Sequence, residues 1–91
     1  MDEVDRGSIV LSLSGHDKAN FFFVVGFEEE NYLLLADGKF RSIDHPKKKK
    51  KKHCKLIKKI GNERIADKLA SGESDADLRK ALKLFLKEEV I

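Results

Sequence analysis

The stretch NFFFVVGF, residues 20–27, is the most β-prone part of this 91-residue chain. Phenylalanine and valine favour strands, and the nearly continuous apolar run predicts a central strand that is covered on both faces. Gly26 falls late in the run, where a glycine indicates a bulge or a sharp bend. The three phenylalanines at 21–23 are predicted to pack in the core with one of them facing outward. The alternative is that one serves as a stacking ring for a nucleic-acid base.

Shorter strand patterns flank this central run on both sides. Apolar and β-branched residues, partly alternating with polar ones, predict four further strands: SIVLSL (8–13), YLLLA (32–36), FRSI (40–43) and HCKLIKK (53–59). The segment SGHDK (14–18) has the composition of a turn. Asp37-Gly38 is a strong hairpin signal, because this pair suits the turn types with positive φ.

After Gly61 the apolar period changes from that of strands to that of helices. NERIADKLASG (62–72) and SDADLRKALKLFLKEEV (74–90) predict two helices, the second with Ser74 or Asp75 as its N-cap. Leu82 and Phe85 belong to the apolar stripe of the second helix and are predicted to pack on the sheet. The chain is therefore expected to be mostly β with C-terminal α. A sheet this small is expected to curl into a five-stranded barrel, capped by the two helices.

The positive charge of the chain is concentrated in one segment. The formal net charge is only +3, yet residues 39–59 contain eleven Lys or Arg and a single acidic residue, Asp44. Residues 1–38 carry a net charge of −6, and residues 60–91 carry −1. A basic block of this kind indicates a binding surface for nucleic acid or for an anionic membrane.

Several classes of protein are not supported by the sequence. No apolar run approaches the ~20 residues that span a bilayer, and the acidic start MDEVDRG does not resemble a secretory signal. The single Cys54 has no partner for an internal disulfide, which fits a reducing cytosol. His53 and Cys54 would point to opposite faces of a strand, so no metal site is expected. No set of nucleophile and base is evident, and we therefore expect neither an enzyme nor a cofactor.

Part of the sequence resembles a known family. RGSIVLSLSGHDKANFFFVVGF (6–27) is similar to the KOW motif: a glycine before a strand, a Gly-x-Asp-Lys loop, and an apolar strand. KOW motifs are part of small SH3-like barrels in ribosomal proteins and in bacterial transcription elongation factors. A longer pattern resembles short bacterial KOW-domain RNA-binding proteins: ADGKFR, then a proline with the lysine run, then KH. Those proteins are related to large-subunit ribosomal proteins of the archaeal and eukaryotic type.

The resemblance covers residues 4–58 and departs from the family at one position of the KOW loop. The family usually has glycine after the Asp-Lys pair, and Ala19 stands there in this chain. If that position requires a positive φ, alanine is strained there, and we expect a loop of different shape.

The resemblance implies a division of the chain and a function. Residues 1–60 would form the SH3-like KOW barrel, with a lysine-rich loop at 46–52, and residues 61–91 a helical extension packed on it. The expected function is RNA binding in the cytoplasm, in association with the ribosome. The expected partner is large-subunit ribosomal RNA, with ribosomal proteins as further contacts and no membrane. Away from the ribosome the protein is expected to be a monomer. The alternative is a protein-interaction KOW barrel that contacts the transcription or translation machinery.

The expected RNA contacts are basic residues, in which lysine offers a point charge for phosphates and arginine a planar two-donor fork. The candidates are Lys18, Lys39, Arg41, Lys47, Lys48, Lys49, Lys50, Lys51, Lys52, His53 and Lys55. Two other interpretations of the lysine run remain: a solvated mobile loop, or a nuclear localisation signal. The KOW loop likewise remains open as an ordinary turn in which Asp17 bonds its own backbone.

Overall fold

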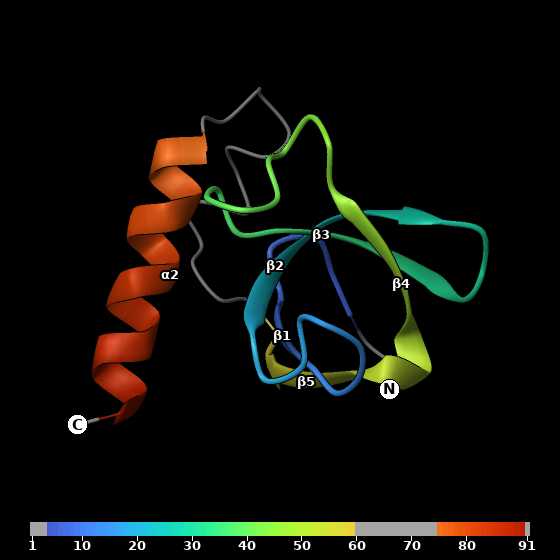
Figure 1. The fold of residues 1–91 in the computed structure, drawn as a ribbon, viewed down its shortest axis with the longest axis horizontal. Helices are drawn as coiled ribbons and strands as arrows, with labels where there is room; N and C mark the ends of the chain where they lie inside the picture. Colours follow the sequence, from blue (N-terminus) through green and yellow to red (C-terminus); the bar gives the residue numbers. More distant parts are fainter. Residues whose placement is uncertain (1–3, 60–74, 91) are drawn as a thin grey trace.

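The computed structural model describes residues 4–59 and 75–90. They form a five-stranded antiparallel sheet with a C-terminal helix beside it (Figure 1). The elements, in chain order, are β1 (Ile9–Ser12), β2 (Phe21–Glu28), β3 (Tyr32–Ala36), β4 (Lys47–Lys50), the 3-10 turn η1 (Lys51–His53), β5 (Cys54–Lys58) and α2 (Asp75–Val90). The helix predicted at 62–72 and the candidate N-cap Ser74 lie outside the described residues.

The central position of β2 confirms the interpretation of its apolar run. The strand order is β4-β3-β2-β1-β5, so β2 lies between β1 and β3. Its pairing with β3 shifts between Val24 and Gly26, which confirms the predicted bulge. A Cβ on Gly26 would lie 3.3 Å from Cδ1 of Leu34, so the missing side chain lets the two strands approach closely.

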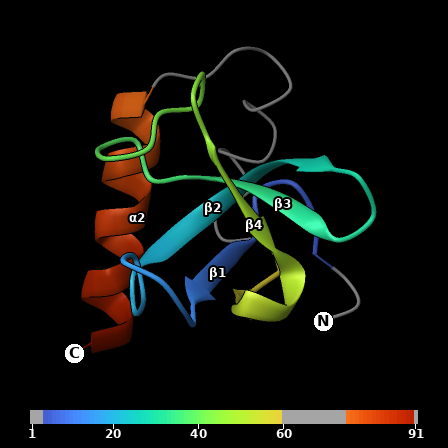
Figure 2. The same cartoon turned by 45° about the vertical axis from the view of Figure 1, so that its right-hand side comes forward.

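Each face of the sheet buries its own apolar cluster. Successive side chains of a strand point to opposite faces, so neighbours such as Phe22 and Phe23 enter different clusters. One cluster holds Val10, Phe22, Val24, Leu33, Leu35 and Cys54. The other joins Ile9, Phe23 and Ala36 to the apolar stripe of α2: Leu78, Ala81, Leu82 and Phe85. The sheet curls over the first cluster, and α2 stands against the second (Figure 2).

Helix α2 covers the face on which one phenylalanine of β2 was expected to be exposed. Phe85 and Leu82 are buried against the sheet, as predicted from the stripe. The ring of Phe21 meets that of Phe85 edge to face, with the centroids 5.9 Å apart. The three phenylalanines at 21–23 therefore pack in or against the core, as predicted, and the expectation that one of them faces outward is wrong.

The fourth strand differs from the prediction. The segment FRSI (40–43) is not a strand, and Lys47–Lys50 of the lysine run form β4 instead. Asp37 explains the difference, because its Oδ1 accepts hydrogen bonds from the backbone N–H groups of Lys39, Phe40 and Arg41, each at 2.9 Å. These bonds close a compact turn instead of a hairpin. The chain then runs as a loop, residues 37–46, before it returns to the sheet.

The loop 37–46 lies against the start of α2 (Figures 1 and 2). Asp75 accepts a hydrogen bond from the backbone N–H of Ile43 at 2.7 Å. Gly38, at a φ of +78°, sits so close to the helix that a Cβ would lie 2.1 Å from the carbonyl oxygen of Asp75. The turn therefore requires glycine both for its conformation and for this contact.

The sheet is curled but open, because β4 and β5 stand at its two ends and are not paired with each other. The closed five-stranded barrel is therefore not formed by the described strands. In the part of the chain that the structure describes, no helix is both long enough and apolar enough to cross a membrane.

Candidate nucleic-acid interface

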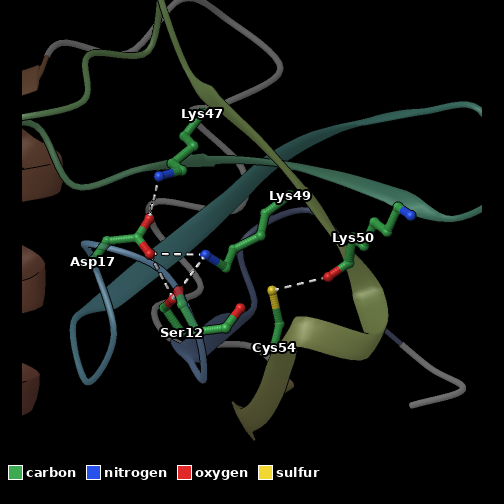
Figure 3. A network of polar contacts seen from close by, with 7 residues as sticks. Ser12, Asp17, Lys47, Lys49, Lys50 and Cys54 are labelled. Carbon is green, nitrogen blue, oxygen red and sulfur yellow. Dashed lines mark hydrogen bonds and ion pairs between the residues drawn. The ribbon is translucent and has the colours of Figure 1, made fainter.

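The lysine run is an edge strand followed by a 3-10 turn, which corrects the expectation of a loop at 46–52. Because side chains alternate along a strand, the run is divided between two sides. Lys47 and Lys49 point toward Asp17 of the loop 13–20, whereas Lys50 points away from it (Figure 3). Six identical residues therefore have different environments.

A buried ion network anchors β4 to the loop 13–20 (Figure 3). Lys49 Nζ lies 2.8 Å from Asp17 Oδ1 and donates a second hydrogen bond to the carbonyl oxygen of Ser14 at 2.7 Å. Lys47 Nζ lies 2.8 Å from Asp17 Oδ2. The hydroxyl of Ser12 donates to Asp17 Oδ1 at 2.8 Å. The loop is thus closed by side chains from β1 and β4, and Asp17 does not bond its own backbone as the ordinary-turn interpretation required.

The network fixes the charge state of Asp17. Burial alone would raise the pKa of this carboxyl group, but hydrogen bonds from Lys47, Lys49 and Ser12 outweigh it and hold the pKa far below its usual range. Lys49 is only 8% exposed, and its ammonium group is used inside the protein. Lys49 is therefore not available to a phosphate, which corrects its assignment as an RNA contact.

The outward lysines of β4 stand beside Tyr32 of β3. Lys48 Nζ lies 4.4 Å from the ring centroid of Tyr32, and Lys50 Nζ lies 6.0 Å from it. Lys48 also approaches the carboxylates of Glu28 and Glu29 at 3.9 and 3.7 Å. These acidic neighbours partly offset the charge of Lys48, so Lys50 is the stronger candidate for binding an anion.

Three consecutive lysines form a basic depression at the end of the run. Lys50, Lys51 and Lys52, which we term the η1 lysine cluster, line a hollow of about 300 Å³ together with Asn31. The backbone N–H of Lys51 donates to the carbonyl oxygen of Asn31 at 2.8 Å, which ties η1 to the turn between β2 and β3. Within the described residues neither Lys51 nor Lys52 forms an ion pair. The cluster therefore presents three adjacent positive charges that no acidic side chain of the described residues neutralises.

The other predicted contacts lie on separate elements. Lys18 is exposed on the loop 13–20, Lys55 is exposed on β5, and His53 is half-buried at the end of η1. Lys39 and Arg41 are exposed on the loop 37–46. Arg41 lines a depression together with the lysine run, a groove of about 180 Å³ that also includes Lys47.

Phe40 is a candidate that the sequence analysis missed. It was placed in a strand and not considered as a contact, but it lies in a loop and its side chain is 76% exposed. Lys39 Nζ lies 5.0 Å from the centroid of its ring. The only sequence signal for this exposure is the Asp-Gly pair just before it, since a tight turn displays the residues that follow it.

Ala19 keeps the backbone conformation that glycine favours. Its φ is +72°, in the left-handed region, and its N–H donates to the carbonyl oxygen of Ser12 at 2.8 Å. The N–H of Ser12 bonds back to the carbonyl oxygen of Asn20 at 2.9 Å. Ala19 therefore adopts the left-handed conformation at the expense of strain, as expected if this position requires a positive φ.

Cys54 is a buried packing residue, as predicted. Its Sγ lies 3.5 Å from the carbonyl oxygen of Lys50, and burial raises the pKa of the thiol. A raised pKa leaves little reactive thiolate. Among residues 4–59 and 75–90, no three His, Cys, Asp or Glu side chains gather as a metal site would require.

Comparison with known proteins adds no relative: no protein-family model matches the chain, and no curated protein sequence matches it.

Proposed function

We propose that this protein is a cytosolic RNA-binding module that contacts the phosphate backbone of structured RNA, with large-subunit ribosomal RNA as the expected partner. The observation that carries the proposal is the η1 lysine cluster, in which three adjacent lysines surround one hollow without acidic partners among the described residues. Neutralising phosphates releases condensed counterions, which supplies affinity without reading sequence.

The fold offers independent support. The small, curled antiparallel sheet of five strands has the strand number that the resemblance to KOW domains implies, although it is open. The KOW-like loop 13–20 is fixed to β4 through Asp17, so part of the run serves the fold while the remainder stays at the surface.

The way the cluster is held suits binding to RNA. Lys50 belongs to a paired strand, and the backbone of Lys51 is bonded to the turn at Asn31. Little backbone freedom is lost when such lysines meet a partner, unlike those of a free tail. Ammonium groups are point charges, so the contacts should follow the shape and backbone of a folded RNA more than its bases. We propose a binding module rather than an enzyme.

A second candidate is a protein-interaction domain. The observation in its favour is an apolar depression of about 370 Å³ between the loop 37–46 and α2, lined in part by Leu82 and Leu86. On the same helix Leu84 is 58% exposed. Exposed apolar surface of this kind can dock a protein partner.

The salt dependence of RNA binding separates the two candidates. We expect replacement of Lys50, Lys51 and Lys52 by glutamine to lower affinity for a folded fragment of large-subunit ribosomal RNA. The slope of log affinity against log salt should become shallower by about 0.7–0.9 for each phosphate that the variant no longer neutralises. The matched control replaces three exposed lysines of α2, Lys80, Lys83 and Lys87, and changes the net charge equally. Equal slopes for the parent and the η1 variant would reject the proposal.

A further inference from the structure

A second groove lies beside the lysine run and contains an aromatic ring. It has a volume of about 180 Å³ and lies between the loop 13–20 and the loop 37–46. We call it the Phe40 groove, and the residues that matter here are His16, Asn20, Phe22, Phe40, Arg41 and Lys47. Drug-sized ligands fill pockets of about 300–1,000 Å³, so this groove suits a single ring system.

Phe40 contributes little to the folded core. Its side chain is 76% exposed, although large apolar side chains are usually buried. The loop that carries it is nevertheless well fixed: three N–H groups bond to Asp37, and the N–H of Ile43 bonds to Asp75. A ring displayed on a fixed backbone loses little conformational entropy when a ligand stacks on it.

Among the described residues, the groove offers one free cation, Arg41, to the phosphate of a ligand. Two carboxylates line it, but both are already engaged within the protein. Asp17 is neutralised by Lys47 and Lys49, and Asp37 accepts its three backbone hydrogen bonds. Arg41 is exposed and forms no ion pair among the described residues, so its guanidinium can donate two parallel bonds to a phosphate.

We infer that the Phe40 groove holds one unpaired RNA base, stacked on Phe40, while Arg41 contacts the phosphate of the same nucleotide. RNA is read mainly where bases leave the helix and stack on aromatic side chains. The inference rests on the proposed function and deepens it: the η1 lysine cluster follows the backbone of the RNA, and the Phe40 groove selects a position where a base is extruded.

Two RNA hairpins that differ by one nucleotide test the inference. One has a single unpaired adenosine in its stem, and the other has a continuous stem of the same sequence. The parent should bind the bulged hairpin more tightly. Phe40→Ala should weaken binding to the bulged hairpin by about 5- to 150-fold, the range of one base–aromatic stack. Binding to the continuous hairpin and the salt slope should not change, because no charge is removed.

Phe40→Trp provides both a rescue and a direct readout. It should restore the preference for the bulge. Since the chain contains no other tryptophan, its fluorescence should change with the bulged hairpin and not with the continuous one. The high exposure of Phe40 means that neither variant should alter the thermal melt. If the parent binds both hairpins equally, or Phe40→Ala weakens both equally, the inference is overturned and the proposed function stands. If the parent binds neither hairpin, nor the folded ribosomal fragment, both are overturned.

Discussion

At the scale of single residues, Asp17 is the point where the loop 13–20 and the edge strand β4 are joined. Its Oδ1 lies 2.8 Å from Nζ of Lys49, and its Oδ2 lies 2.8 Å from Nζ of Lys47. The hydroxyl of Ser12 also donates a hydrogen bond to Oδ1. A buried charge is tolerated only when it is paired and hydrogen-bonded. Two of the six consecutive lysines are therefore occupied in holding the fold.

Lys49→Gln should destabilise the protein, because it removes an ammonium group that is buried against Asp17. Hydrogen bonds to charged groups contribute about 1.5–3 kcal/mol, and Lys47 still pairs with Asp17, so we expect a loss of about 2 kcal/mol. Lys50→Gln, one position further along the same strand, should cost no more than about 0.5 kcal/mol. Denaturant unfolding measures both. Equal effects would contradict the division of the run between two sides.

Asp17 should make stability depend on pH. Its pKa is depressed in the folded protein, so its stabilisation is complete above the unfolded value of about 3.9 and is lost as the pH falls below it. Asp17→Asn should therefore be less stable than the parent at pH 7. The two free energies of unfolding should converge as the pH drops below about 4. A difference that stayed constant from pH 7 to pH 2 would exclude a linked carboxylate.

Ala19→Gly should stabilise the protein. A left-handed conformation costs a residue with a Cβ about 1–2 kcal/mol, which glycine avoids. Glycine has a larger conformational entropy in the unfolded state, and this offsets about 0.5–1 kcal/mol of the gain. The net gain should be about 0.5–1 kcal/mol. Ala76→Gly, at an exposed position of α2, is the control and should cost about 0.5–1 kcal/mol. A loss of stability in Ala19→Gly would show that the loop adopts another conformation.

At the scale of elements, α2 completes the domain by covering the sheet face formed by Ile9, Phe23 and Ala36. A sheet of this size buries too little apolar surface by itself. Phe85→Ala should therefore cost about 3–5 kcal/mol. Leu84→Ala, one residue earlier and 58% exposed, should change the thermal melt very little. A melt unaffected by Phe85→Ala would mean that the helix leaves the sheet in solution.

Local sequence patterns predicted most of these elements. The strands β1, β2, β3 and β5 and the C-terminal helix could be located from apolar periodicity, because each buries its residues with the period of its own backbone. The strand β4 could not, since a run of lysines carries neither alternation nor β-branched residues. Its strand pairing depends on contacts distant in sequence: the ladder with residues 32–35 and the bonds from Lys47 and Lys49 to Asp17. The exposure of Phe40 likewise follows from how the loop 37–46 meets α2.

The composition of the sequence therefore located the basic segment, but it did not show which of its lysines lie at the surface. The charge count located the basic segment, and the chain there does gather lysines at one surface hollow. Identical residues give no sequence signal for which of them is buried. That assignment became possible only once the direction of each side chain from β4 was known.

At the scale of the whole molecule, the positive charge is concentrated in residues 39–59 of a chain whose net charge is only +3. The segment contains ten lysines and one arginine. Such a surface is rich in point charges and poor in planar forks, so it should recognise phosphates and the shape of a folded RNA. Base changes that preserve the RNA fold should then have little effect, apart from the one position proposed for the Phe40 groove.

A competition assay at fixed salt measures whether the protein prefers folded RNA to other polyanions. The parent protein is bound to a folded fragment of large-subunit ribosomal RNA, and unlabelled competitors of equal phosphate number are added. We predict that the same folded RNA displaces the protein at lower concentration than duplex DNA, because the two differ in helix geometry and in 2′-hydroxyls. Equal competition by duplex DNA would contradict the account and would leave the protein a general polyanion binder.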